Sequence, residues 1–250
     1  MFNFNQNQND NMNFANQNSQ DIAIPRTFMA SVFSWMFFAL AITAIFAYYF
    51  STNVAFFKSL YDVDPVTGRV GMSGLGWIVM LSPLAVVLIM SFGFNKLSSS
   101  ILTLLFVGYS FLMGMSLSFI FFAYTTGSIF LTFAVTAGTF GVMALVGYTT
   151  NTDLTKFGSI MMMALVGIII ASLVNMFMHS SSLDWLISIA GVLIFTGLTA
   201  YDVQKLKRIA GGVEYGTEPT KKLVIMGALR LYLDFINLFL FLLRFMGNRK

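Results

Sequence analysis

Seven apolar stretches, each close to the length that a helix needs to cross a bilayer, constrain this chain more than any other feature. They cover residues 29–50, 75–94, 101–124, 128–150, 160–178, 185–204 and 223–245. A spanning helix requires about 20 predominantly apolar residues. Most links between the stretches are short, so successive spans run antiparallel and pack side by side. The sequence therefore predicts an all-α polytopic membrane protein with seven transmembrane helices.

The composition supports this class and excludes several others. The chain is 57% hydrophobic and 10% charged, whereas soluble domains carry about 25% charged residues. It has no cysteine and a single histidine, His179, so disulfides, thiolate chemistry and histidine metal centres are not expected. No catalytic triad, HExxH motif or phosphate-binding loop can be assembled from its residues. We therefore expect neither an enzyme nor a bound cofactor, and no nucleic-acid partner.

The chain divides into a polar tail and a membrane domain. Residues 1–24 begin with a run rich in Asn and Gln, which cannot bury a core, and are predicted to be a disordered tail. Residues 25–250 form the predicted seven-helix membrane domain. The tail lacks the features of a signal peptide.

The positions of Lys and Arg predict the orientation in the membrane. If the N-terminus is cytoplasmic, the inner loops hold Arg26, Lys96, Lys156, Lys205, Lys207, Arg208, Lys221 and Lys222, and the outer loops hold Lys58 and Arg69. The positive-inside rule favours this orientation. It leaves Arg244, Arg249 and Lys250 outside, which a re-entrant last segment would avoid. The last stretch could reach about 34 Å as a helix, however, which favours a full crossing.

One acidic residue lies in the middle of the last apolar stretch. Asp234 is about eleven residues from either end of 223–245. An ionised carboxylate at that depth costs several kcal/mol, so such residues usually face the protein interior and have a partner. We therefore take Asp234 as the first candidate for a functional site.

Asp202, at the inner end of the sixth span, is the predicted partner. The sixth and seventh spans form an antiparallel pair, which would bring Asp202 and Asp234 together if the sixth helix continues through Lys205–Arg208. Two carboxylates in a low-dielectric site cannot both ionise cheaply and would titrate as a coupled pair. A shared proton would hold the helices together, and its loss would create repulsion or a site for a divalent cation such as Ca²⁺.

A different pairing of the charges is also compatible with the sequence. Asp234 has Arg230 four residues earlier on its own helix, and Asp202 has Lys205 and Lys207 nearby. Such local ion pairs would neutralise each acid separately. Arg230 would tune the electrostatics of the site in either arrangement.

Other polar and small residues are weaker candidates. Tyr201, Tyr232 and Asn237 flank the acids and could support them by hydrogen bonds, in the case of Asn237 across helices. Glycines in the spans predict close approach between helices. These are Gly108, Gly114, Gly138, Gly141, Gly147, Gly167, Gly191 and Gly197.

The segments around the two acids resemble the Bax inhibitor-1 family, also known as transmembrane Bax inhibitor motif proteins. The resemblance is carried by Leu231–Met246 (LYLDFINLFLFLLRFM), Gly227–Leu229 and Thr199–Asp202 with Gln204. It implies a seven-helix fold with the C-terminal helix at its centre. It also implies a pH-sensitive Ca²⁺ leak controlled by an aspartyl pair, here Asp202 and Asp234. The tail suggests a bacterial member in the cytoplasmic membrane.

The chain departs from the family pattern in its basic residues. The second span has no charge, and Lys96 just beyond it is the nearest candidate for electrostatic tuning. Arg230 stands where a small or uncharged residue is expected. The rival hypothesis is a non-conducting regulator that binds another membrane protein, such as a membrane-bound AAA protease. The sequence does not distinguish a channel from an exchanger or from this regulator, nor does it give the oligomeric state.

Overall fold

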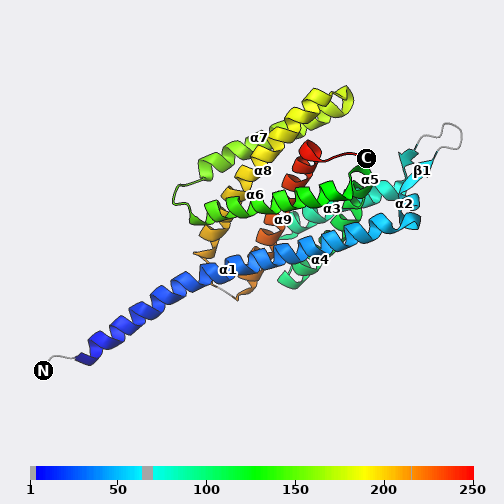
Figure 1. The fold of residues 1–250 in the computed structure, drawn as a ribbon. Coiled ribbons are helices and arrows are strands. Elements are labelled where there is room, and N and C mark those ends of the chain that lie inside the picture. Colours follow the sequence, from blue (N-terminus) through cyan, green and yellow to red (C-terminus); the bar gives the residue numbers. More distant parts are fainter. Residues whose placement is uncertain (1–3, 64–69, 215) are drawn as a thin grey trace.

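The computed structural model describes residues 4–63, 70–214 and 216–250, and most of this part of the chain is helical (Figure 1). The helices are α1 (Phe4–Thr52), α2 (Val54–Leu60), α3 (Gly74–Gly93), α4 (Ser99–Leu117), α5 (Ile120–Ala123), α6 (Thr126–Thr149), α7 (Thr155–Met178), α8 (Ser181–Ala210) and α9 (Glu218–Met246). Two short strands, β1 (Tyr61–Val63) and β2 (Val70–Met72), pair antiparallel in the long loop before α3.

Seven segments are long and apolar enough to cross a membrane. They are Pro25–Thr52, Gly74–Gly93, Ser99–Ala123, Thr126–Thr149, Thr155–Met178, Ser181–Ala210 and Glu218–Met246. Each contains one of the stretches predicted from the sequence or overlaps it closely. The predicted all-α class with seven spans is therefore confirmed, and the β1–β2 hairpin is a small addition outside the spans.

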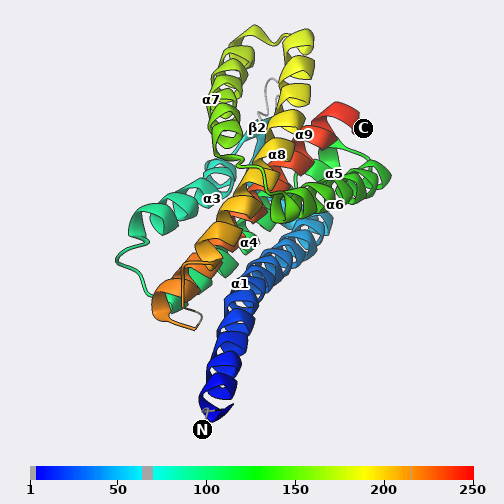
Figure 2. The ribbon, with the colours of Figure 1, turned by 90° about the vertical axis from the view of Figure 1, so that its left-hand side faces the viewer.

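The C-terminal helix α9 occupies the centre of the bundle (Figures 1 and 2). It packs against α1, α4, α6 and α8, and 67% of its most apolar part is buried, compared with 11% for α7. The peripheral helices have fewer partners, and α3 packs mainly against α4 and α7 mainly against α8. The predicted central position of the last helix is confirmed, and its buried residues are enclosed by α1, α4, α6 and α8.

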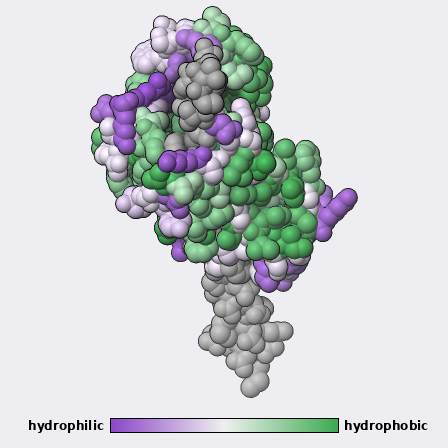
Figure 3. All heavy atoms as spheres, turned by 90° about the vertical axis from the view of Figure 1, so that its right-hand side faces the viewer, coloured by the Kyte–Doolittle hydropathy of each residue, from purple (hydrophilic) through white to green (hydrophobic). Residues whose placement is uncertain are grey.

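The outer surface of the bundle is apolar. Large side chains such as Phe92 and Phe177 are 83% and 78% exposed, and hydrophobic residues form broad areas in Figure 3. Soluble monomers rarely expose contiguous apolar surface of this kind. The surface is suited to contact with lipid acyl chains, as expected for a multi-pass membrane protein.

The last span crosses the whole bundle and does not turn back. The C-terminal residues lie beside the α5–α6 connection, where Thr125 N donates to Asn248 O (3.0 Å) and Lys250 N donates to Ala123 O (3.1 Å). The C-terminus lies at the end of the bundle opposite to the start of α1 (Figure 1). The full crossing favoured by length is thus found rather than the re-entrant segment favoured by charge alone. The cytoplasmic location of the N-terminus stays a prediction.

In the structure, α1 extends into the polar tail. α1 begins at Phe4 and continues without interruption into the membrane domain; residues 1–3 lie outside the described residues, and the disorder expected for residues 1–24 stays a prediction. A helix that is already nucleated extends by one hydrogen bond for each residue that it orders. The packed part of α1 can therefore nucleate the helix that runs back into the tail.

Close helix approach is confirmed at some of the predicted glycines and not at others. A Cβ atom at Gly147 on α6 would collide with the backbone of Ala200 on α8, and one at Gly114 would lie 2.7 Å from Thr43 O on α1. Gly191 and Gly197 face the rings of Phe241 and Phe157. The prediction is wrong at four glycines, where a Cβ would meet nothing within 4 Å: Gly108, Gly138, Gly141 and Gly167.

We expect Gly147→Ala to destabilise the bundle by about 1–3 kcal/mol, because an added methyl group forces α6 away from α8. Thermal unfolding in detergent micelles measures the effect. Gly141→Ala is the matched control, since it makes the same chemical change on the same helix in open space. Equal unfolding temperatures for the two variants would contradict the close approach of α6 and α8.

Candidate functional site

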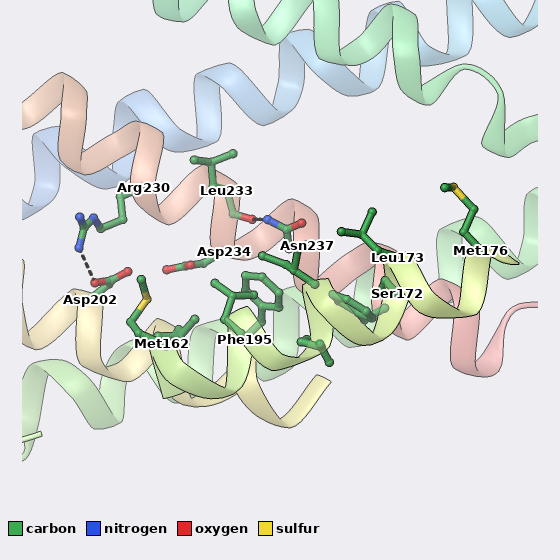
Figure 4. A pocket seen from close by; sticks show the side chains of 15 residues that line it. Met162, Ser172, Leu173, Met176, Phe195, Asp202, Arg230, Leu233, Asp234 and Asn237 are labelled. Carbon is green, nitrogen blue, oxygen red and sulfur yellow. Dashed lines mark hydrogen bonds and ion pairs between the residues drawn. The ribbon is translucent and has the colours of Figure 1, made fainter. Parts of the chain in front are cut away.

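The two predicted aspartates lie together inside the membrane domain. α8 continues to Ala210, as the pairing required, and therefore carries Asp202 to the level of Asp234 on α9. Asp202 is 6% exposed and Asp234 is 5% exposed. Their carboxyl groups point toward each other across the space between the two helices (Figure 4). The structure thus brings the pair together from adjacent antiparallel helices.

Arg230 joins the two helices at this site. Its Nη1 donates to Asp202 Oδ1 at 3.0 Å, so the guanidinium pairs with the acid on the other helix. The charged groups that act on Asp234 are Asp202 and Arg230. Asp234 Oδ2 is buried and has no hydrogen-bond partner among the residues that the structure describes. An ionised Asp234 therefore lacks a partner for this oxygen, which costs about 1–3 kcal/mol, whereas a proton shared with the facing carboxyl group of Asp202 would satisfy it.

The lysines near Asp202 have other partners. Lys207 Nζ donates to Tyr148 O at 2.7 Å and lies 5.0 Å from the centre of the Tyr148 ring. Lys205 Nζ lies 5.9 Å from the ring of Tyr201. Local neutralisation of Asp202 by these lysines, the alternative that the sequence left open, is therefore not observed. Its counter-charge comes from α9.

Tyr232 is one predicted support that does not reach the acids. Its hydroxyl lies 2.7 Å from Thr43 Oγ1, which itself donates to Ser110 O at 2.9 Å. Because the single hydroxyl proton of Thr43 is thus used, Tyr232 is the donor to Thr43. Tyr232 therefore faces α1 and α4, on the other side of α9 from Asp202. The helical period already indicates this, because a residue two positions before Asp234 lies about 200° away from it around the helix axis.

The remaining predicted supports contribute less than expected. Asn237 Nδ2 donates to Leu233 O at 2.8 Å on its own helix, not across helices as predicted. Tyr201 packs against Gly158 of α7. Lys96 is exposed in the α3–α4 connection and does not line the cavity at the pair. Electrostatic tuning by Lys96 stays a prediction, whereas Arg230 contacts Asp202 directly.

A cavity of about 660 Å³ opens beside the pair. It lies between α7, α8 and α9 (Figure 4). α7 packs against α8 and does not cover the face of α9 that carries Asp234. Its lining consists of Met162, Leu165, Ile168, Ile169, Ser172, Leu173, Met176, Phe195, Leu198, Asp202, Arg230, Leu233, Asp234, Asn237 and Phe241. The charged groups of the pair are thus accessible from a largely apolar cleft.

The pair offers two carboxyl groups as ligands for a metal ion. Ca²⁺ takes six to eight oxygen ligands in a stable site. In residues 4–63, 70–214 and 216–250, no group of three or more His, Cys, Asp or Glu side chains is placed to hold a metal ion. Asp202 and Asp234 could therefore supply part of a hydrated ion's coordination, and Arg230 would compete for Asp202.

A second polar cluster, not predicted from the sequence, fixes the α6–α7 connection. Gln204 of α8 accepts from Leu154 N (2.9 Å) and donates to Thr152 O (2.7 Å). Arg208 binds Asp153 at 2.6 Å. Hydrogen bonds from Thr155 and Arg208 lower the pKa of Asp153 below its usual range, so this acid stays ionised at neutral and mildly acidic pH. The only sequence signal was Gln204 in the segment that resembles the family.

The fold and the site define a polytopic helical membrane protein with an acidic site in its interior. Its features are seven spanning helices, a buried terminal helix and two facing intramembrane carboxyl groups. The family model described as "Inhibitor of apoptosis-promoting Bax1" matches residues 25–250. The chain belongs to this family, the Bax inhibitor-1 family, and the resemblance seen in the sequence is confirmed.

Several bacterial proteins are similar to the chain over nearly its whole length. An uncharacterised protein of Borreliella burgdorferi is 48% identical over 234 residues, which cover 94% of this chain and 97% of the relative. The inner membrane protein YbhL of Escherichia coli K12 is 46% identical over 237 residues, with coverage of 93% and 97%. The uncharacterised protein RP147 of Rickettsia prowazekii is 42% identical, with coverage of 90% and 91%.

Proposed function

We propose that the protein is a pH-sensitive Ca²⁺ leak in which Asp202 and Asp234 act as the proton sensor and the cation-binding pair. The observation that carries the proposal is the facing of two buried carboxyl groups from α8 and α9 at the edge of a cavity. Carboxylate oxygens are preferred ligands of Ca²⁺. Family membership and a bilayer-suited surface support the proposal.

The proposed gate is the contact between α8 and α9. A proton shared by the two carboxyl groups removes their repulsion and keeps the helices together. When the proton is lost, the charges of Asp202 and Asp234 repel each other and attract a divalent cation. Beyond the pair, the path is filled by buried apolar residues of α9, including Leu238 and Leu242. The helices must therefore separate for an ion to pass.

The proposed location is a bacterial cytoplasmic membrane with the N-terminus in the cytoplasm. The E. coli relative YbhL is named as an inner membrane protein. In the seven-span arrangement the loops richest in Lys and Arg lie at the end of the bundle opposite to the C-terminus. The positive-inside rule then favours a cytoplasmic position for that end.

Ca²⁺ uptake into proteoliposomes at pH 5 to 8 tests the leak. We expect flux to rise with pH in the wild type and to lose this dependence in the Asp202→Asn/Asp234→Asn double variant, which cannot share or release the proton. Asp62→Asn is the matched control, because Asp62 is an exposed acid in β1. The proposed mechanism would be ruled out if wild-type flux did not change with pH. It would also be ruled out if the flux of the double variant still depended on pH.

A second candidate function is the regulation of another membrane protein, such as a membrane-bound protease, without conduction. The observation that favours it is that the N-terminal part of α1, which is formed by the polar tail, projects beyond the bundle (Figures 1 and 2). A projecting helix could bind a partner at the membrane surface. Deletion of residues 1–24 separates the two functions. Loss of a co-purifying membrane partner with unchanged Ca²⁺ flux would assign the tail to regulation.

A further inference from the structure

The cavity beside the aspartyl pair continues to the end of the bundle that carries the C-terminus. A second cavity of about 610 Å³ lies there, and Ser172 and Met176 of α7 line both cavities. Together the cavities form one groove along α7, which we name the α7–α9 groove. Its middle part is walled by apolar side chains such as Ile169, Leu173 and Phe241. The volumes are in the range of about 300–1,000 Å³ that holds organic ligands in proteins.

The mouth of the α7–α9 groove carries an excess of positive charge. Arg244 and Arg249 both face Asp184 there. Arg244 Nε donates to Asp184 Oδ2 at 3.0 Å, and its Nη2 contacts the other carboxylate oxygen. Arg249 Nη2 lies 3.8 Å from the same Oδ2, and its side chain is 65% exposed. One carboxylate therefore serves two guanidinium groups, and Arg249 keeps most of its donors free for an anion.

The depth of the groove matches one leaflet of a bilayer. Asp234 precedes Arg244 by ten residues on a continuous helix, which corresponds to about 15 Å. This is half of the roughly 30 Å hydrocarbon core. If Arg244 and Arg249 lie at the headgroup level, Asp234 and Asn237 lie near the middle of the membrane. A lipid chain that starts at the arginines would therefore end beside the pair.

We infer that the α7–α9 groove binds an anionic glycerophospholipid. The lipid phosphate is held at Arg249 and Arg244, because planar guanidinium donors match phosphate oxygens. One acyl chain lies along Ile169, Leu173 and Phe241. Such a lipid has a negatively charged headgroup and an apolar chain about as long as one leaflet is thick. The cationic mouth of the groove matches the headgroup, and its apolar walls match the chain.

The bound chain would also affect the pair. Its end excludes water from the cavity beside Asp234, and a charged carboxylate or a hydrated cation is costly in a dry site. This consequence rests on the proposed leak, and binding itself does not. We expect anionic lipid to reduce Ca²⁺ flux at a given pH in proteoliposomes.

Native mass spectrometry of the delipidated protein in detergent, titrated with phosphatidylglycerol or phosphatidylcholine, tests the binding without reference to flux. We expect phosphatidylglycerol to bind more tightly. Arg249→Gln should weaken its binding about tenfold, because a charge-assisted hydrogen bond to phosphate is lost. Leu173→Trp should also weaken it about tenfold by filling the groove.

Val174→Trp is the matched control for the groove. Leu173 and Val174 are adjacent and are 55% and 46% exposed, but Val174 does not line either cavity. Its variant should bind phosphatidylglycerol like the wild type. Equal effects of the two tryptophans, equal affinity for both lipids, or displacement of the lipid by inorganic phosphate would each overturn the assignment. None of these results would change the pH test of the leak.

Discussion

Replacement of Arg230 by glutamine is expected to move the pH midpoint of Ca²⁺ flux upward by about one to two pH units. In the wild type, the guanidinium donates to Asp202 at 3.0 Å and is one of the two charged groups that act on Asp234. A nearby cation favours the ionised form of a carboxyl group. Without it, the pair holds its proton to higher pH, so less Ca²⁺ passes at neutral pH.

At the alkaline end of the titration, Arg230→Gln should conduct more Ca²⁺ than the wild type. Once both carboxyl groups are ionised, Arg230 is a positive charge beside the path of a divalent cation, and glutamine removes that repulsion. The two flux curves are therefore expected to cross. Arg230→Lys is the control, because it retains the charge while losing the guanidinium geometry, and its midpoint should stay near that of the wild type. Superimposable curves for Arg230→Gln and the wild type would show that Arg230 does not tune the pair.

The membrane architecture could be predicted because it depends on properties that are local in the sequence. Each span is a continuous apolar run, and the short links force antiparallel neighbours. The pairing of Asp202 with Asp234 also followed from local features, since the only condition was that the sixth helix continue through Arg208. α8 runs to Ala210 and satisfies it.

The choice of ionic partner could not be predicted in the same way. Arg230 has Asp234 one turn away on its own helix and Asp202 on the next helix. Which carboxylate it reaches depends on the distance and rotation between α8 and α9, which the sequence pattern does not specify. Likewise, the α7–α9 groove exists because α7 packs mainly against α8, a packing result without a sequence signature. The direction of Tyr232, by contrast, follows from the helical period, because it lies two residues from Asp234 on the same helix.

The aspartyl pair also lowers the stability of the folded protein, and this links stability to the proposed function. Asp234 is buried among apolar residues of the central helix, and one of its oxygens has no hydrogen-bond partner in the described part of the chain. Core positions of a bundle are ordinarily filled by apolar side chains, which need no partner. An ionised carboxyl group here weakens the contact between α8 and α9, and a contact that weakens when the proton is lost is what the proposed gate requires.

Asp234→Asn is therefore expected to make the protein more stable and at the same time abolish the pH dependence of its leak. The amide has nearly the shape of the carboxyl group, carries no charge and can donate to Asp202. We expect stabilisation of about 1–3 kcal/mol at pH 8, measured by thermal unfolding in detergent micelles. The gain should be smaller at pH 5, where a proton shared with Asp202 already reduces the repulsion in the wild type.

Asp184→Asn is the matched control, because Asp184 is an aspartate whose carboxylate forms ion pairs. It binds Arg244 and lies 3.8 Å from Arg249, so its replacement should lower stability by up to about 1 kcal/mol, as for other partly exposed ion pairs. Opposite signs for the two substitutions would show that the carboxyl group of Asp234 works against folding. A loss of stability in Asp234→Asn at both pH values would mean instead that Asp234 holds α8 and α9 together, and that the separation of these helices is not the gate.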